Sequence, residues 1–235
     1  MKRGFKTYAR KLALEIRAEL GLTAFVRFDP YELAGEYGIP VYELSDLGRD
    51  NGAQNAARHF GSDHSAVFSA ALVPVGSGMF IIDNDHQTST RRRSSVSHEM
   101  SHLLLEHAFD EVLVTADGCR SYDKDKEDEA TWLAGELLVP YEAAERAAWE
   151  DLSNEDVAGQ FDVSIRMAAM RMNFSGARKV VALQRAHGLC GSRLPGISNT
   201  AACPCHGTLL QPGITGTDHS ACARNSLSAS ATANG

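Results

Sequence analysis

The feature that most constrains the fold of this chain is a pair of histidines, His98 and His102, four residues apart in the run HEMSH. Residues four apart on an α-helix lie on one face with their Cβ atoms about 6 Å apart. Both imidazoles can therefore reach one Zn²⁺ ion at roughly 2.0–2.1 Å. Glu99 lies about 100° around the same helix, beside such an ion. The pattern predicts a zinc site in which Glu99 is a general base that moves a proton from water to a leaving amine.

The segments around this run predict a helix with one buried side. Four apolar residues at helical spacing form that side: Val96, Met100, Leu103 and Leu104. They predict a helix over 94–107, which Arg91–Arg93 precede as a solvated approach. Upstream, 66–75 and 78–82 are rich in β-branched and aromatic residues, and the Gly-Ser between them predicts a hairpin or two adjacent strands.

The remaining elements of the first 150 residues alternate between helix and strand. Five large apolar residues at spacings of three and four predict a helix over 5–20: Phe5, Tyr8, Leu12, Ile16 and Leu20. Asp29 and Pro30 predict the start of a helix over 31–37, and a strand follows over 39–44. Another helix over 123–138 is stopped by Pro140. This order predicts an α+β fold with a small antiparallel or mixed sheet.

A catalytic zinc site also needs a third protein ligand and an open position for water. Glu106 lies two turns, about 12 Å, along the helix from His98, and His107 is excluded for similar reasons. A third histidine six residues after the second would fall on Ala108, so the longer signature of that kind is absent. The third ligand must come from another element.

The helix predicted over 123–138 begins with a group of acids that could supply this ligand. They are Glu127, Asp128 and Glu129. Carboxylates also complement the dipole at a helix N-terminus. For any one of them alone, a solvated first turn explains the residue as well as metal binding does.

The two motifs together resemble the ImmA/IrrE family of zinc metallopeptidases, over about residues 25–175. HEMSHLLLEH is followed, about 25 residues after the second histidine, by EDEATWLAGELLVP. The family pattern is HExxH with a Leu-rich stretch, then E-x-x-A-N-x-x-A-x-x-L-L-M-P. Its first Glu is the third zinc ligand and falls on Glu127, thirteen residues before Pro140. Thr131 and Val139 replace the usual Asn and Met, which leaves the ligand position intact.

The resemblance implies a zincin-like metallopeptidase domain that uses Zn²⁺ as its cofactor. His98, His102 and Glu127 would hold the ion, with Glu129 as the reserve ligand and Glu99 as the base. Segment 78–84 resembles the strand before the motif, which in zincins commonly lies at the cleft edge, where extended substrate can pair with it; an ordinary core strand is an equal alternative.

The sequence assigns no residue to stabilise the oxyanion of such a reaction. Zincins need a donor that faces the developing negative charge. Three candidates can be named on that ground alone: Tyr122, His86 and the Arg91–Arg93 cluster. For the arginines, the solvated approach to the helix is the favoured interpretation.

Residues 151–188 form a separate helical unit in this interpretation. Ser153 and Asp156 predict a capping box, and a break at 162–164 precedes a second helix, so the unit resembles a helix-turn-helix. Four basic residues would form a local patch: Arg166, Arg171, Arg178 and Lys179. The second helix offers few side chains that read bases. Structural packing or partner docking is favoured over sequence-specific DNA binding.

The last segment, 189–235, differs sharply in composition from the rest. More than half of its residues are Gly, Ala, Ser, Thr or Pro, which predicts disorder. Its potential metal ligands are Cys190, Cys203, Cys205, His206, His219 and Cys222. Their spacing is not that of a zinc finger or ribbon, so a disordered tail is the favoured interpretation.

Charge and hydropathy narrow the class of protein further. Among 235 residues, 23 are basic and 30 acidic, which gives a net charge of -7 and argues against extensive nucleic-acid binding. No apolar run approaches the roughly 20 residues of a membrane span. Charges near the N-terminus exclude a signal peptide, and Cys119 is the single cysteine before residue 190. These features predict a cytoplasmic protein without a disulfide framework.

Three functional hypotheses follow from the sequence. The leading hypothesis is a zinc endopeptidase whose substrate, as the resemblance implies, is a helix-turn-helix repressor of a mobile element or stress regulon, encoded nearby. The alternative is a non-proteolytic regulator of the same fold that sequesters a repressor or acts as an antitoxin. A third is a DNA-binding stress regulator that works through Arg166 and Arg171.

Overall fold

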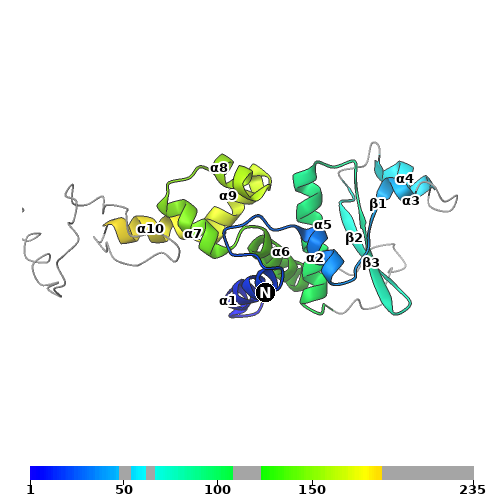
Figure 1. Ribbon diagram of the computed structural model, residues 1–235, viewed down its shortest axis with the longest axis horizontal. Helices are drawn as coiled ribbons and strands as arrows, with labels where there is room; N and C mark the ends of the chain where they lie inside the picture. The colour runs from blue at the N-terminus through cyan, green and yellow to red at the C-terminus, as the bar shows by residue number, and fades with distance from the viewer. Residues whose placement is uncertain (48–53, 62–66, 108–122, 187–235) are drawn as a thin grey trace, which may run out of the picture. The chain divides into compact units, whose positions relative to one another are not determined.

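The computed structural model describes residues 1–47, 54–61, 67–107 and 123–186 (Figure 1). Contacts group Met1–His187 into one compact unit. The predicted domain 1–150 and nearly all of the predicted unit 151–188 fall within it. Tail residues 189–235, with their cysteines and histidines, lie outside the described residues. Within the described residues, helices predominate over a small three-stranded sheet, which confirms the mixed α+β class.

The sheet has the strand order β1-β3-β2. Strand β1 (Val41–Glu43) pairs parallel to β3 (Gly78–Asp83), and β2 (Ala70–Val75) pairs antiparallel to β3. The predicted hairpin is therefore confirmed. Gly76 lies in its tight turn with a φ of 58°, a left-handed conformation that favours glycine.

The central position of β3 bears on one expectation about the site. Segment 78–84 was a candidate for the strand at the cleft edge, with an ordinary core strand as the equal alternative. β2 pairs with β3 over 78–83 and β1 pairs with it over 81–83, so both edges are occupied at 81–83. A substrate peptide cannot pair with those residues, which favours the core-strand alternative there, and β2 is an edge strand of the described sheet.

Helix α1 (Phe5–Glu19) buries Phe5 and Ile16 as predicted, but small and charged residues complete its buried face. Tyr8 is 53% exposed, whereas Ala9, Ala13 and Arg17 are buried. The Arg17 guanidinium donates to the backbone oxygens of residues 23, 26 and 137, and burial lowers its pKa to about 10. Small alanines thus let α1 pack closely on α6 (Lys124–Leu138).

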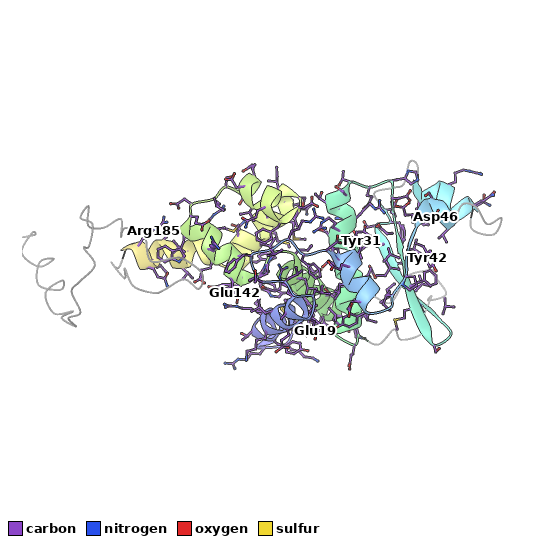
Figure 2. The ribbon with its side chains drawn as sticks, viewed as in Figure 1. Glu19, Tyr31, Tyr42, Asp46, Glu142 and Arg185 are labelled. Carbon is purple, nitrogen blue, oxygen red and sulfur yellow. The ribbon has the colours of Figure 1, made fainter. Side chains whose placement is uncertain are left out.

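Two further contacts fix the outer elements. Helix α2 (Pro30–Glu36) begins as predicted, because the Asp29 carboxylate accepts a hydrogen bond from the Tyr31 N–H at 3.0 Å. Arg10 of α1 donates to Glu142 at 2.7 Å, and Figure 2 labels Glu142. The sequence did not predict four other helices: α3 (Leu44–Leu47), α4 (Gln54–Gly61), α7 (Tyr141–Trp149) and α10 (Ala177–Ala186).

Helix α5 (Ser89–Leu104) carries the HEMSH run and packs on β2, β3 and α6. Val96 and Met100 are fully buried, as their spacing predicts. The helix starts five residues earlier than predicted, so the three arginines are part of it. Arg91 is exposed, as the solvated interpretation expects. That interpretation is wrong for the other two, since Arg93 is only 5% exposed and Arg92 is paired with acids.

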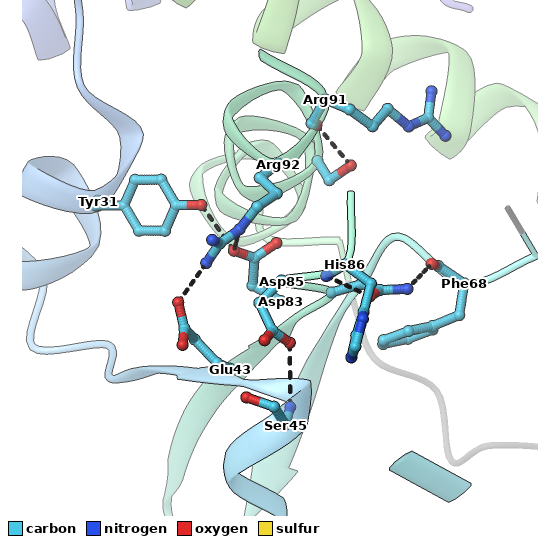
Figure 3. Close-up of polar contacts among 11 residues, drawn as sticks. Tyr31, Glu43, Ser45, Phe68, Asp83, Asp85, His86, Arg91 and Arg92 are labelled. Carbon is cyan, nitrogen blue, oxygen red and sulfur yellow. Dashed lines mark hydrogen bonds and ion pairs between the residues drawn. The ribbon is translucent and has the colours of Figure 1, made fainter. Parts of the chain in front are cut away.

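Asp83 anchors α5 to the sheet. Its Oδ2 accepts hydrogen bonds from the Tyr31 hydroxyl and from Arg92 Nε, both at 2.7 Å, and Arg92 also reaches Glu43 at 2.9 Å (Figure 3). Burial, and then the hydrogen bond to Asp83, raise the pKa of Tyr31 above its ordinary value. Tyr31 of α2 and Arg92 of α5 thus meet at the fully buried carboxylate of β3, and Arg92 joins them to β1 through Glu43.

The predicted unit after residue 150 contains α8 (Asn154–Phe161) and α9 (Ile165–Phe174). The capping box is present, with the Asp156 N–H donating to Ser153 Oγ at 3.1 Å and the Ser153 N–H donating to the Asp156 carboxylate at 2.9 Å. Asp162 has a φ of 51° at the break between the helices. These two helices pack on each other and α9 packs on α6 and α7.

The sequence predicts that Arg171 belongs to a basic surface patch, but the structure buries it. It is 1% exposed, its Nη2 lies 2.6 Å from Glu136 Oε1, and its Nε donates to the Val139 carbonyl at 2.9 Å. Arg171 therefore joins α9 to the end of α6, and it is unavailable to nucleic acid. None of the described helices is both long and apolar enough to span a bilayer.

Candidate metal centre

The two histidines of α5 lie on one face and converge at their Nε2 atoms. These atoms are 3.1 Å apart, and the ring planes meet at 81° with centroids 4.7 Å apart. The four-residue spacing produces this arrangement because it repeats close to one helical turn. His98 and His102 thus present two nitrogen ligands toward the same point.

Glu127 brings a carboxylate to that point from the first turn of α6. Its Oε2 lies 3.2 Å from His98 Nε2, and its Oε1 lies 3.6 Å from His102 Nε2. Asp123 starts α6 by accepting from the N–H groups of the first turn, which fixes the side on which Glu127 emerges. Within the described residues, one ligand atom from each of His98, His102 and Glu127 lies within 4.8 Å of the others.

Small side chains let α5 and α6 approach closely enough for this convergence. Ser97 and Ser101 on α5, and Ala130 and Ala134 on α6, are all buried. Ser97 Oγ donates to the Ala134 carbonyl at 3.4 Å, and Ser101 Oγ donates to the Ser97 carbonyl at 2.7 Å. The hydroxyls are therefore satisfied within the interface without adding bulk.

The distances between the donor atoms are close to those around a tetrahedral metal ion. Ligands bound at roughly 2.05 Å in a tetrahedron lie about 3.3 Å from one another. The two Nε2 atoms are 3.1 Å apart, Glu127 Oε2 lies 3.2 Å from His98 Nε2, and Glu127 Oε1 lies 3.6 Å from His102 Nε2, so each carboxylate oxygen faces one histidine. The side chains of His98, His102 and Glu127 are 25%, 12% and 34% exposed. This partial exposure leaves the site accessible from solvent, as a catalytic centre requires.

Glu99 points toward the sheet edge and is not part of this ligand group. Its Oε2 accepts a hydrogen bond from the Leu72 N–H of β2 at 3.0 Å. The placement of Glu99 beside a bound ion stays a prediction of the sequence. The contact with β2 is a feature that sequence reasoning missed, because Leu72 and Glu99 are 27 residues apart.

His107 and Glu129 form a second group directly behind His102. His107 Nδ1 lies 3.0 Å from His102 Nδ1, and its Nε2 lies 3.7 Å from Glu129 Oε2. Burial lowers the pKa of His107, although the Glu129 carboxylate acts in the opposite direction. Glu129, the reserve ligand, thus faces His107, and the ligand group contains Glu127 in its place.

The described arginine candidates for stabilising an oxyanion are held by other groups. Arg91 donates to Ser69 Oγ at 2.9 Å, and Arg92 and Arg93 donate to Asp83, Glu43 and backbone oxygens. His86 lies between β3 and α5, where its backbone N–H donates to Asn84 Oδ1 at 3.1 Å. The remaining candidate, Tyr122, lies outside the described residues.

Together, the mixed sheet, the HExxH helix and the His-His-Glu group define a metallopeptidase-like domain. The family model for the IrrE N-terminal-like domain, Peptidase M78, matches residues 34–173, which is more than half of the chain. The chain belongs to this family, the ImmA/IrrE family of metallopeptidases. Helix α1 and helix α10 lie outside the matched residues. No curated protein matches the chain at the level of significance applied.

Proposed function

We propose that this protein is a zinc-dependent endopeptidase whose ligands are His98, His102 and Glu127. The observation that carries the proposal is the convergence of three side chains from two helices, with the two Nε2 atoms 3.1 Å apart and one oxygen of Glu127 within 3.2–3.6 Å of each. Two imidazoles and one carboxylate are a ligand set of catalytic zinc sites, which keep one position for water. Membership of a peptidase family supports the same conclusion.

The residues of the site divide the chemistry between them. A zinc ion held there supplies Lewis-acid polarisation of water and of a peptide carbonyl. The Glu99 carboxylate takes one proton from the attacking water as the oxygen bonds to the carbonyl carbon, and it delivers that proton to the amine nitrogen as the C–N bond breaks. The hydrogen bond from the Leu72 N–H holds one oxygen of Glu99 in place for this role.

We further propose that the substrate is a regulatory protein in the cytoplasm, a helix-turn-helix repressor of a mobile element or stress regulon encoded nearby. The family membership motivates this substrate class. Zinc is the metal proposed because nitrogen and carboxylate ligands in tetrahedral spacing suit it. Burial of Arg171 argues against DNA as the partner of α9.

The test is cleavage of the helix-turn-helix proteins encoded beside this chain by the full, zinc-loaded protein. Replacing Glu99→Gln removes the base but preserves the shape of the side chain, so cleavage should fall by a factor of about a hundred or more while zinc stays bound. Glu155→Gln is the matched control, because Glu155 is an exposed residue of α8. Mass spectrometry of the products reports the cleavage site.

Two outcomes would contradict the peptidase proposal. If Glu99→Gln retains full cleavage, the activity belongs to another site or to a contaminant. If neither the wild type nor Glu99→Gln cleaves the repressor, but both bind it equally and relieve repression, the protein is a non-proteolytic regulator of the same fold. Cleavage by the wild type and by Glu155→Gln alone is the result expected.

A further inference from the structure

The chain turns back on itself where α5 ends, and this turn brings His107 against His102. The His107 N–H donates to the His102 carbonyl at 3.1 Å, and the Glu106 N–H donates to the Leu103 carbonyl at 2.9 Å. These two bonds define a Schellman motif. Glu106 occupies the left-handed position with a φ of 49°, where glycine is usual. The imidazoles of His102 and His107 consequently lie with their centroids 5.1 Å apart.

The two ring nitrogens of His102 face different groups. Nε2 faces His98 and Glu127, at 3.1 and 3.6 Å, whereas Nδ1 faces His107 Nδ1 at 3.0 Å. A neutral imidazole that binds a metal through one nitrogen carries its proton on the other. In the metal-bound form His102 must therefore donate from Nδ1, and His107 must accept at its own Nδ1.

The same reasoning fixes the proton of His107. A neutral His107 that accepts at Nδ1 carries its hydrogen on Nε2, and Nε2 lies 3.7 Å from the Glu129 carboxylate. Glu129 accepts a hydrogen bond from the Lys2 N–H at 3.1 Å, which holds its carboxylate in place. The side chains of His107 and Glu129 are only 10% and 9% exposed, so water competes little for these contacts.

We propose that His107 is a positioning residue that fixes the tautomer and ring orientation of His102 toward the metal, with Glu129 as its support. The inference rests on the proposed function, since it concerns the same metal site. Metal-binding histidines commonly donate their second N–H to a carboxylate or carbonyl. Here His107 lies between the metal ligand His102 and the Glu129 carboxylate. Loss of such outer contacts typically weakens metal binding about tenfold to a hundredfold.

The experiment compares two substitutions of His107 in the full chain. His107→Leu fills the space but cannot accept a hydrogen bond, whereas His107→Asn keeps an acceptor close to the position of Nδ1. Zinc affinity is measured by competition with a chromophoric chelator, and the absorption spectrum of the Co²⁺-loaded protein reports ligand geometry. Unfolding of the metal-free protein is followed in parallel. His59→Ala is the matched control, because His59 is an exposed histidine of α4.

The proposal predicts that His107→Leu binds zinc about tenfold to a hundredfold more weakly and alters the Co²⁺ spectrum. His107→Asn should retain most of the affinity, and metal-free stability should be similar in all variants. Should His107→Leu not fold, Glu129→Ala tests the same contacts from the other end and should weaken zinc binding in the same direction.

Several results would overturn the proposal. Unchanged zinc affinity and an unchanged Co²⁺ spectrum in His107→Leu would exclude a positioning role. Equal losses in His107→Leu and His107→Asn, together with lower metal-free stability, would make His107 a structural residue only. A wild type that binds no zinc would overturn the proposed function as well. A wild type that binds zinc but cleaves nothing would overturn the peptidase proposal alone, because affinity still decides the role of His107.

Discussion

Two groups of ionisable side chains in this molecule differ in how their charges are matched and in how far they are exposed. Glu136 and Arg171 form a buried pair of opposite charges, with exposures of 2% and 1% and an N···O distance of 2.6 Å. The group formed by His98, His102 and Glu127 gathers two imidazoles and a carboxylate, all of which can donate electron pairs to a cation. It is also more exposed, at 12–34% per side chain.

This difference separates a structural contact from a binding site. A buried pair of matched charges needs nothing further, and its role is to hold α6 against α9. A cluster rich in electron-pair donors becomes favourable when a cation completes it. Removing a member of each group should therefore affect different quantities, stability in the first case and metal affinity in the second.

The largest expected effect is on the buried pair. Arg171→Met leaves the Glu136 carboxylate buried without its partner, which should lower the free energy of unfolding by about 3–5 kcal/mol. Arg166→Met is the control, because Arg166 is exposed on the same helix and its loss should change stability little. Urea unfolding monitored by circular dichroism measures both. Equal free energies of unfolding for Arg171→Met and the wild type would show that the ion pair adds no stability beyond that of packing.

The second effect concerns the metal-ligand group. Structural zinc sites gain about 10–16 kcal/mol from four ligands, so loss of one ligand in His102→Ala should cost about 3 kcal/mol of binding, roughly a hundredfold in affinity. Metal-free stability should stay close to that of the wild type. Calorimetric zinc titration and thermal unfolding in chelator separate the two quantities. A destabilised metal-free protein would contradict the proposed difference between the groups.

A third prediction tests how tightly the Arg171 side chain packs against Gly135 of α6. A Cβ at Gly135 would lie 2.8 Å from Arg171 Cδ, and Arg171 is held by its bonds to Glu136 and Val139. Gly135→Ala should therefore destabilise the protein by about 1–3 kcal/mol. Gly159→Ala is the matched control, since a Cβ there meets nothing within 4 Å and should stabilise α8 by about 0.4–1 kcal/mol. Loss of stability in both variants would point to a general intolerance of helical alanine.

The smallest effect is expected at the exposed capping box of α8. Ser153→Ala should cost about 1 kcal/mol at neutral pH. The bonds from Ser153 hold the pKa of the Asp156 carboxyl below its ordinary value of 3.8. A lowered folded-state pKa gives stability that is fully present above the unfolded value and lost as pH falls through the folded one. The difference between variant and wild type should therefore shrink in acid, and a constant difference would exclude the charge of Asp156 as a contributor.

Local signals in the sequence predicted the elements that depend on a few neighbouring residues. Each of these signals comes from two residues no more than four positions apart: Asp29 with Pro30, Ser153 with Asp156, and His98 with His102. The resemblance then selected Glu127 among three adjacent acids, which spacing alone left open. These parts of the fold and the site needed no knowledge of distant contacts.

Features set by distant partners could not be predicted in the same way. The 5–20 helix was expected to bury Tyr8, but small alanines and Arg17 face the core because Arg17 finds carbonyl acceptors as far away as Leu137. The central position of β3 depends on pairing with β1, which lies some 40 residues earlier. Sequence periodicity contains no information about either partner.

The contact between α5 and α6 has a consequence for which metal ion the site prefers. The two helices approach through Ser97, Ser101, Ala130 and Ala134, none of which belongs to the metal-ligand group. The gap between the histidines and Glu127 is thus set by the bulk of residues at the helix contact. A larger residue at Ala130 would widen that gap and shift the preference toward ions of greater radius. Discrimination between cations is in this sense a property of the backbone separation as much as of the coordinating atoms.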